Sequence, residues 1–211
     1  MASERWHTDG MFDPGSLDEA VDLMCDGDGD AFRVVYRSVQ APLLRYLEVL
    51  VGPDDAEDVA SETWGQAFRD LDRFTGDADA FRGWITTIGR HRALDLLRQR
   101  SRRVRVDSDL AGLDPPDSAD TEVAMLEGFT TVAALAVIRS LPRDQAEAVM
   151  LRAVMGLDAK SAGVVLGKRP GAVRSATHRG LATLARRLES RPASLVEVRD
   201  TFVSPGAEVV R

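Results

Sequence analysis

The chain has 211 residues, a hydrophobic content of 44% and a formal net charge of −7. This length is sufficient for one medium domain or two small ones, and the composition is that of an ordinary globular protein. No apolar run approaches the roughly 20 residues of a membrane-spanning helix, and no secretory signal is visible. The single cysteine, Cys25, excludes an internal disulfide and does not support a cysteine-based metal site. We therefore expect a cytoplasmic protein with no membrane contact, no metal and no cofactor.

The net charge conceals a segregation of acids and bases along the chain. Eight arginines and one acid give residues 82–105 a charge of +7, and residues 128–190 carry +6. Residues 106–127 contain seven acids and no base, and residues 1–30 carry −8. Two basic segments separated by an acidic one are typical of a protein with two polyanion-binding surfaces. Chance variation of charge between solvated helix faces is the alternative.

Helical periodicity begins after residues 1–28, an acidic segment rich in Gly and Asp that we interpret as a flexible extension. A first helix is expected over about 31–50, with Pro42 kinking or restarting it and Gly52-Pro53 ending it. The sequence PDDAED begins a second helix, and a third spans about 81–100. The expected core positions of the second helix are Ala56, Val59, Ala60, Trp64, Ala67, Phe68 and Leu71.

The second half of the chain begins with an acidic linker. Residues 106–121 contain a Pro-Pro pair and five aspartates without apolar periodicity, which predicts an extended connection between domains. Helices return in 122–190, and no segment shows the alternation typical of strands. The predicted fold is therefore all-α, with helical domains at 29–105 and 122–190 and a tail, 191–211, of unassigned role.

Residues 156–188 predict a helix-turn-helix. Gly167 supplies the positive φ of a tight turn, and Pro170 suits the first turn of the next helix. The expected inward positions of this helix are Val173, Thr177, Leu181, Leu184 and Leu188. The outward side chains can bond guanine edges and phosphates, which predicts that duplex DNA binds at Arg169, Arg174, Ser175, His178 and Arg179. An ordinary helical hairpin with a solvated face is the alternative.

The stretch FRGWITTIGRHRALDLLRQRSRRVR, residues 81–105, combines arginines with aromatic rings. Arginine neutralises phosphate and aromatic rings stack on unpaired bases, so the mixture favours melted DNA over simple duplex. A place in the core is an equally good interpretation of Phe81 and Trp84. The candidate DNA-binding residues are Phe81, Arg82, Trp84, Arg90, His91, Arg98, Arg102 and Arg103.

A competing signal is the sequence D-D-x-x-D formed by Asp54, Asp55 and Asp58. Carboxylates one helical turn apart can bind magnesium and diphosphate, as in all-α prenyl enzymes. That interpretation requires an aromatic-lined cavity, whereas aromatic residues make up only 6% of this chain. Acidic residues at the start of a helix are the simpler explanation.

The order of these motifs resembles that of bacterial RNA polymerase sigma factors of the extracytoplasmic-function group. DAEDVASETWGQAFRDLDRF is similar to the part of their second conserved region that docks on the polymerase clamp helices. FRGWITTIGRHRALDLLRQ is similar to the segment that melts and reads the minus-ten promoter element. The sequence from Ser140 to Leu184 is similar to the fourth region, whose helix-turn-helix reads the minus-thirty-five element.

The resemblance implies partners and residue roles. It implies binding to core RNA polymerase through the β′ clamp helices and the β flap, binding to promoter DNA, regulation by an anti-sigma factor, and no enzymatic activity. The residues that fall at the clamp-binding positions are Asp58, Ser61 and Glu62, although the family usually has glutamine at the second. His91 stands where many members have asparagine. Lys168 replaces a usually apolar residue, which either alters the turn packing or places a charge beside the DNA.

A plain helix-turn-helix regulator that binds duplex DNA without polymerase is a second hypothesis. It accounts for residues 156–188 but not for the arginines and aromatic residues of 81–105. For the N-terminal extension, 1–28, we expect a role in shielding the basic surfaces of the free protein.

Overall fold

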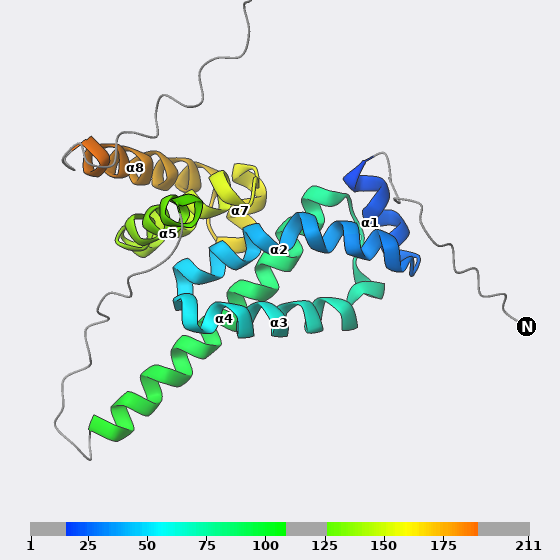
Figure 1. Cartoon of the computed structure of the whole chain (residues 1–211), viewed down its shortest axis with the longest axis horizontal. Coiled ribbons are helices and arrows are strands. Elements are labelled where there is room, and N and C mark those ends of the chain that lie inside the picture. Colours follow the sequence, from blue (N-terminus) through cyan, green and yellow to red (C-terminus); the bar gives the residue numbers. More distant parts are fainter. Residues whose placement is uncertain (1–15, 109–125, 190–211) are drawn as a thin grey trace, which may run out of the picture.

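The computed structural model describes residues 16–108 and 126–189 (Figure 1). These residues form helices and their connections, with no strand in the two described ranges, which confirms the all-α prediction. Residues 1–15, 109–125 and 190–211 lie outside the description, and with them most of the expected linker and the whole expected tail.

The first domain is built from four α-helices and a short 3-10 turn, Leu71–Arg73. Helix α3 packs beside α2, and α4 packs across both of them. Gly52 separates α2 from α3 with a φ of 91°, so the predicted break at Gly52-Pro53 is confirmed. The helices are α1 (Leu17–Cys25), α2 (Gly29–Val51), α3 (Pro53–Arg69) and α4 (Ala78–Ser108).

Helix α1 corrects the expectation that residues 1–28 are a flexible extension, for the described part of that segment, residues 16–28. The backbone N–H of Glu19 donates to the Ser16 hydroxyl at 3.1 Å and caps the helix, which is the first half of a capping box. Ala20, Val21 and Met24 are buried against the rest of the domain. The high Asp and Gly content of this segment concealed a helix whose apolar residues are spaced three and four apart.

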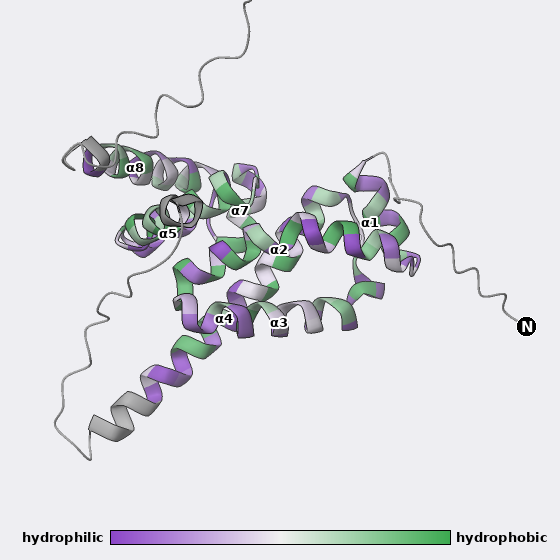
Figure 2. Cartoon of the chain, viewed as in Figure 1, coloured by the Kyte–Doolittle hydropathy of each residue, from purple (hydrophilic) through white to green (hydrophobic). Residues whose placement is uncertain are grey.

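Helices α2 and α4 also differ from expectation. Helix α2 continues through Pro42 instead of restarting there. Helix α4 begins three residues before Phe81 and runs to Ser108, so the first part of the expected linker is helical. Its C-terminal half projects from the bundle, and hydrophilic residues recur along it (Figures 1 and 2).

The second domain contains α5 (Leu126–Arg139), α6 (Arg143–Val149), α7 (Ala159–Leu166) and α8 (Pro170–Glu189). A π-helical turn, Met150–Val154, continues α6. Helix α8 packs on α6 and α7. Gly167 joins α7 to α8 with φ 64° and ψ 33°, in the left-handed region predicted for this turn.

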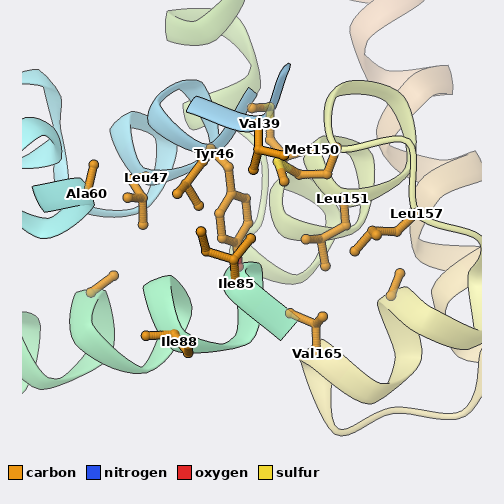
Figure 3. Close-up of a cluster of buried hydrophobic side chains, with 14 of the residues drawn as sticks. Val39, Tyr46, Leu47, Ala60, Ile85, Ile88, Met150, Leu151, Leu157 and Val165 are labelled. Carbon is orange, nitrogen blue, oxygen red and sulfur yellow. The ribbon is translucent and has the colours of Figure 1, made fainter. Parts of the chain in front are cut away.

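The two domains pack directly against each other. Helix α4 contacts α7, and α2 contacts α5, α6 and the π-helical turn. Side chains from both domains meet in one buried cluster that includes Tyr46 and Ile85 from the first and Met150, Leu151 and Val165 from the second (Figure 3). The described residues therefore form one body with a continuous core.

Candidate nucleic-acid interface

The five residues predicted to bind duplex DNA lie on one exposed surface at the start of α8. Arg169 stands in the turn, and the other four follow on the outer face of the helix. Asp158 begins α7 by accepting the Ser161 N–H at 2.6 Å, and this hydrogen bond lowers the pKa of the Asp158 carboxyl. Arg169, Arg174 and Arg179 form no ion pair within the described parts of the chain.

The inner face of α8 differs in part from the predicted one. Val173, Ala176 and Gly180 are buried on the inner face of α8. Leu181, which was predicted to face inward, is 48% exposed. A Cβ atom at Gly180 would lie only 2.7 Å from Cγ2 of Val149. A glycine is therefore required where α8 crosses α6, and the leucine-based pattern misplaced the inward face by one residue.

Lys168, which precedes α8, is held inside its own domain. Its Nζ lies 2.6 Å from Oδ2 of Asp144 at the start of α6. The hydrogen bond from Lys168 lowers the pKa of the Asp144 carboxyl. This pairing favours the interpretation that Lys168 contributes to turn packing.

The candidate residues for melted DNA are divided between the core and the surface of α4. Phe81 is 2% exposed, so the core interpretation of this ring is correct and it cannot stack on a base in this arrangement. Trp84 is half-buried, with its ring centroid 5.1 Å from that of Phe74 and 5.7 Å from that of Phe81. Phe81 and Trp84 thus pack between α4 and the loop before it. The sequence had left their place in the core as one of two interpretations.

The remaining candidates on α4 follow its length. His91, Arg98 and Arg102 are exposed, and Arg98 forms an ion pair of 2.7 Å with Asp95. Arg82 forms an ion pair of 2.8 Å with Asp79, on its own helix. Arg103 belongs to the same helix, and its side chain lies outside the description. The exposed candidates on α4 are therefore His91, near its middle, and Arg98 and Arg102, on its projecting C-terminal half.

Arg90 differs from the other candidates because it forms an ion pair with an acid of the second domain. Its Nε donates to Oε2 of Glu147 at 2.6 Å, and Nε of Arg143 donates to Oε1 of the same carboxylate at 2.9 Å. Burial alone would lower the pKa of Arg90, but the hydrogen bond and charge of Glu147 raise it. Burial raises the pKa of the adjacent Tyr46 hydroxyl well above its usual value, and the charge of Glu147 adds to this effect.

The residues expected to bind the clamp helices lie together on α3. Asp58, Ser61 and Glu62 are all exposed, and Glu62 lies 3.6 Å from Arg92 of α4. They form a polar outer face on a helix whose inner residues, including Trp64, are buried.

Phe68 lies near the end of the same helix and was expected in the core, but it is 69% exposed. Its ring centroid lies 6.2 Å from that of Phe32, which in turn lies 6.1 Å from that of Tyr36. Phe68 and Tyr36 are exposed and Phe32 is half-buried, so the three rings form a partly exposed aromatic patch beside the polar face of α3. Spacing alone could not have revealed its exposure, because a position four residues beyond the buried Trp64 and one beyond the buried Ala67 predicts the inner face of the helix.

The magnesium interpretation of Asp54, Asp55 and Asp58 is not supported. Asp55 forms an ion pair with Arg100 of α4. No group of three or more carboxylate, imidazole or thiolate side chains is arranged to hold a metal ion within the described residues. Among the described helices, none is both long enough and apolar enough to cross a membrane.

Comparison with known proteins identifies both domains. Residues 35–103 match Sigma-70 region 2, and residues 131–184 match Sigma-70, region 4. The ECF RNA polymerase sigma factor BldN of Streptomyces coelicolor is 32% identical over 183 residues, covering 83% of this chain and 67% of that protein. The ECF RNA polymerase sigma factor ShbA of Streptomyces griseus is 32% identical over 168 residues, covering 75% of this chain and 88% of that protein.

The fold agrees with this assignment. A co-crystal structure of the sigma factor RpoE with the anti-sigma factor NepR from Bartonella quintana matches with a TM-score of 0.59 and 23% identity, covering 75% of this chain and 97% of RpoE. The chain belongs to the extracytoplasmic-function group of the sigma-70 family. It is therefore an alternative sigma factor, which directs transcription initiation by recognising promoters.

Proposed function

We propose that the three exposed surfaces divide the work of initiation among polymerase, duplex DNA and melted DNA. The observation that carries the proposal is the exposed group Arg169, Arg174, Ser175, His178 and Arg179, at the start of a helix that follows a left-handed turn. A helix in this setting can enter the major groove, where each bidentate arginine–guanine contact contributes about 1–3 kcal/mol of discrimination. This surface binds the minus-thirty-five element.

The exposed candidates on α4 bind the minus-ten element. His91, at the position where many family members have asparagine, contacts an unstacked base, while Arg98 and Arg102 neutralise phosphates. Extruding a base costs a few kcal/mol. The protein supplies no covalent chemistry, so this cost is offset by phosphate contacts and by binding to polymerase.

The outer face of α3 binds core RNA polymerase. Asp58, Ser61 and Glu62 are directed to solvent, and α3 is fixed from behind by its buried residues. In this function the clamp helices of β′ contact the acidic face, and the second domain contacts the β flap. Without polymerase, neither DNA contact is sufficient to open a promoter.

The test is transcription of genomic DNA by core polymerase with and without the protein, followed by sequencing of the transcript ends. We expect new start sites that share two upstream elements. Glu62→Ala should reduce both polymerase binding and these transcripts. Glu57→Ala, which removes the same charge from another exposed position of α3, should change neither.

The outcomes separate the hypotheses. An unchanged set of transcripts and no binding to core polymerase would refute the proposal. Tight, sequence-specific binding to duplex DNA without polymerase, combined with unchanged transcripts, would favour the plain regulator.

We also propose that an anti-sigma factor regulates this protein. The support is the fold likeness to RpoE, which was solved in complex with NepR. Purification of the native protein from uninduced cells should give a stoichiometric complex that is inactive in transcription until its partner is removed. Recovery of the protein only with core polymerase, in every growth condition, would contradict this.

A further inference from the structure

Arg92 of α4 reaches across to α3 and contacts two of its side chains. Its Nε and Nη2 atoms donate to Oε1 of Gln66 at 3.0 Å and 2.9 Å. Its Nη1 atom lies 3.6 Å from Oε2 of Glu62. Glu62 and Gln66 are four residues apart, so they are neighbours on the same face of α3. One guanidinium group therefore joins two adjacent side chains of the helix that is proposed to bind polymerase.

The contact of Arg92 with Gln66 is the anchor of this arrangement. A guanidinium group is planar and rigid, so two hydrogen bonds from one of its edges fix the plane of the whole group. Gln66 is half-buried, and it holds the edge formed by Nε and Nη2. The remaining nitrogen, Nη1, is thereby directed towards Glu62, whose side chain is 64% exposed. The outer contact thus ends on a carboxylate that faces solvent.

The ion pair between Arg92 and Glu62 contributes little to folding. An N···O separation of 3.6 Å is longer than a hydrogen bond, and ion pairs of exposed side chains add little to stability. Its effect is on the freedom of Glu62. A long side chain that becomes ordered on binding costs affinity, and a side chain that is already held in the free protein avoids part of that cost. Arg92 meets Oε2, and the carboxylate has a second oxygen for a basic partner.

A second bridge from α4 to α3 shows what is particular to the first. Arg100 forms an ion pair with Asp55, near the start of α3. The Asp55 side chain is 19% exposed, so this acid is largely covered by the protein itself. Both bridges tie α4 to α3. Of the two, the bridge from Arg92 ends on an acid that is open to a partner.

We propose that Arg92 is a positioning residue for polymerase binding. It is anchored on Gln66 and holds the Glu62 carboxylate in the direction from which a basic side chain of the clamp helices approaches. Arg92 acts through Glu62 and makes no contact with polymerase itself. The identification of Glu62 as a polymerase contact rests on the proposed function.

The test is a titration of the full-length protein, carrying a dye on its single cysteine, Cys25, with core polymerase. Fluorescence anisotropy gives the dissociation constant. Arg92→Ala should weaken binding about threefold to tenfold, because Glu62 must then be ordered on binding. Arg100→Ala is the matched control, since it removes the other bridge between α4 and α3, and it should change the constant by less than about twofold.

A double-mutant cycle shows whether Arg92 acts through Glu62. In the Glu62→Ala protein, Arg92→Ala should have no further effect, because no carboxylate is left to position. Gln66→Ala should weaken binding as Arg92→Ala does, since it removes the anchor and keeps both charges. Circular dichroism and urea denaturation establish that the variants are folded. If Arg92→Ala is not, Gln66→Ala replaces it in the cycle and decides.

Failure of the positioning role and failure of the proposed function give different results. Additive losses in Arg92→Ala and Glu62→Ala would overturn the positioning role and indicate a direct contact between Arg92 and polymerase. Equal losses in Arg92→Ala and Arg100→Ala would also overturn it, since general support of α3 would explain both. A loss in Glu62→Ala without a loss in Arg92→Ala would refute the positioning role alone. An unchanged affinity in Glu62→Ala would refute the polymerase contact of the proposed function, and the positioning role with it.

Discussion

Helices α4 and α8 are the two basic elements of this protein, but their arginines are in different states. On α4, five arginines form ion pairs with acids of the same chain: Arg82, Arg90, Arg92, Arg98 and Arg100. On the surface of α8 that is proposed to read duplex DNA, Arg169, Arg174 and Arg179 have no ion-pair partner in the described part of the chain. The surface proposed for duplex DNA is therefore free of such pairs in the described residues, whereas the surface proposed for melted DNA is partly occupied by acids of the same chain.

The packing of the two helices explains this difference. Three arginines of α4 reach acids of neighbouring helices, two on α3 and one on α6, while Arg82 and Arg98 pair with acids of α4 itself. Helix α8 packs mainly on α6 and α7 and leaves its outer face to solvent. In the proposed function, the helix that binds melted DNA is thereby placed at the interface between domains, and the helix that reads intact duplex is not.

The largest expected effect comes from disturbing the support of α8. Gly180→Ala should lower the free energy of unfolding by about 1–3 kcal/mol, because its Cβ would lie 2.7 Å from Val149 and 3.3 Å from the carbonyl oxygen of Gln145. Urea denaturation measures this change. Gly171→Ala is the control on the same helix, where a Cβ meets no atom within 4 Å, and it should stabilise by up to about 1 kcal/mol. Equal effects would show that α8 does not depend on this close approach.

The second-largest expected effect is the loss of DNA-binding free energy when an arginine is removed from the outer face of α8. Arg174→Ala should weaken holoenzyme binding to the minus-thirty-five element by about 1–3 kcal/mol and relax base preference at one position. Arg186→Ala, at an exposed position nearer the end of α8, should weaken binding only slightly and without changing preference. Footprint titrations on promoters with single-base changes distinguish the two. A uniform loss for both variants would mean that α8 binds phosphates only.

On α4 we predict that two exposed residues differ in role, with His91 setting base preference and Arg102 contributing only affinity. His91→Ala should change the preferred minus-ten sequence, because His91 faces an unstacked base in the proposed function. Arg102→Ala should lower affinity for all sequences alike and reduce the salt slope by about 1, because one phosphate contact is lost. Titrations at several salt concentrations measure both. A changed base preference in Arg102→Ala would contradict the division.

The smallest effect concerns the ion pair that supports the turn before α8. Lys168 depresses the pKa of Asp144, so this pair stabilises the fold above the unfolded-state pKa of about 3.9 and ceases to do so as the pH falls through the lower, folded-state pKa. Because Asp144 is largely exposed, Asp144→Asn should cost at most about 1 kcal/mol at pH 7. Urea denaturation of both proteins should show this difference at pH 7 and its progressive decrease as the pH falls below about 3.9. A difference that persists at the lower pH would exclude the ion pair as its cause.

The positions of most helices could be predicted from the sequence because apolar periodicity and punctuation by Gly and Pro are local signals. Gly52, Gly167 and Pro170 each do what their chemistry predicts. Helix α1 was also locally encoded, in Ser16, Glu19 and three spaced apolar residues, but the acidic composition concealed it. Its detection required giving more weight to spacing than to composition.

The interface between domains could not be predicted because its partners are distant in sequence. The sequence of the helix that contains Glu147 does not distinguish this residue from an exposed acid. Its burial beside Arg90, 57 residues away, appears only in the folded chain. Phe68 was misplaced for a related reason: the pattern marks it as apolar, but the width of the buried face of α3 depends on how α2 and α4 lie against it. Tertiary packing decides both cases.

The most direct test of the central claim is the affinity of the protein for each promoter element, with and without core polymerase. Fluorescence anisotropy would be measured with a minus-thirty-five duplex and with an unpaired minus-ten strand, both taken from a promoter identified by transcript sequencing. The free protein should bind the duplex and scarcely bind the strand, and the holoenzyme should bind both. Equal affinity of the free protein and the holoenzyme for the minus-ten strand would contradict the account.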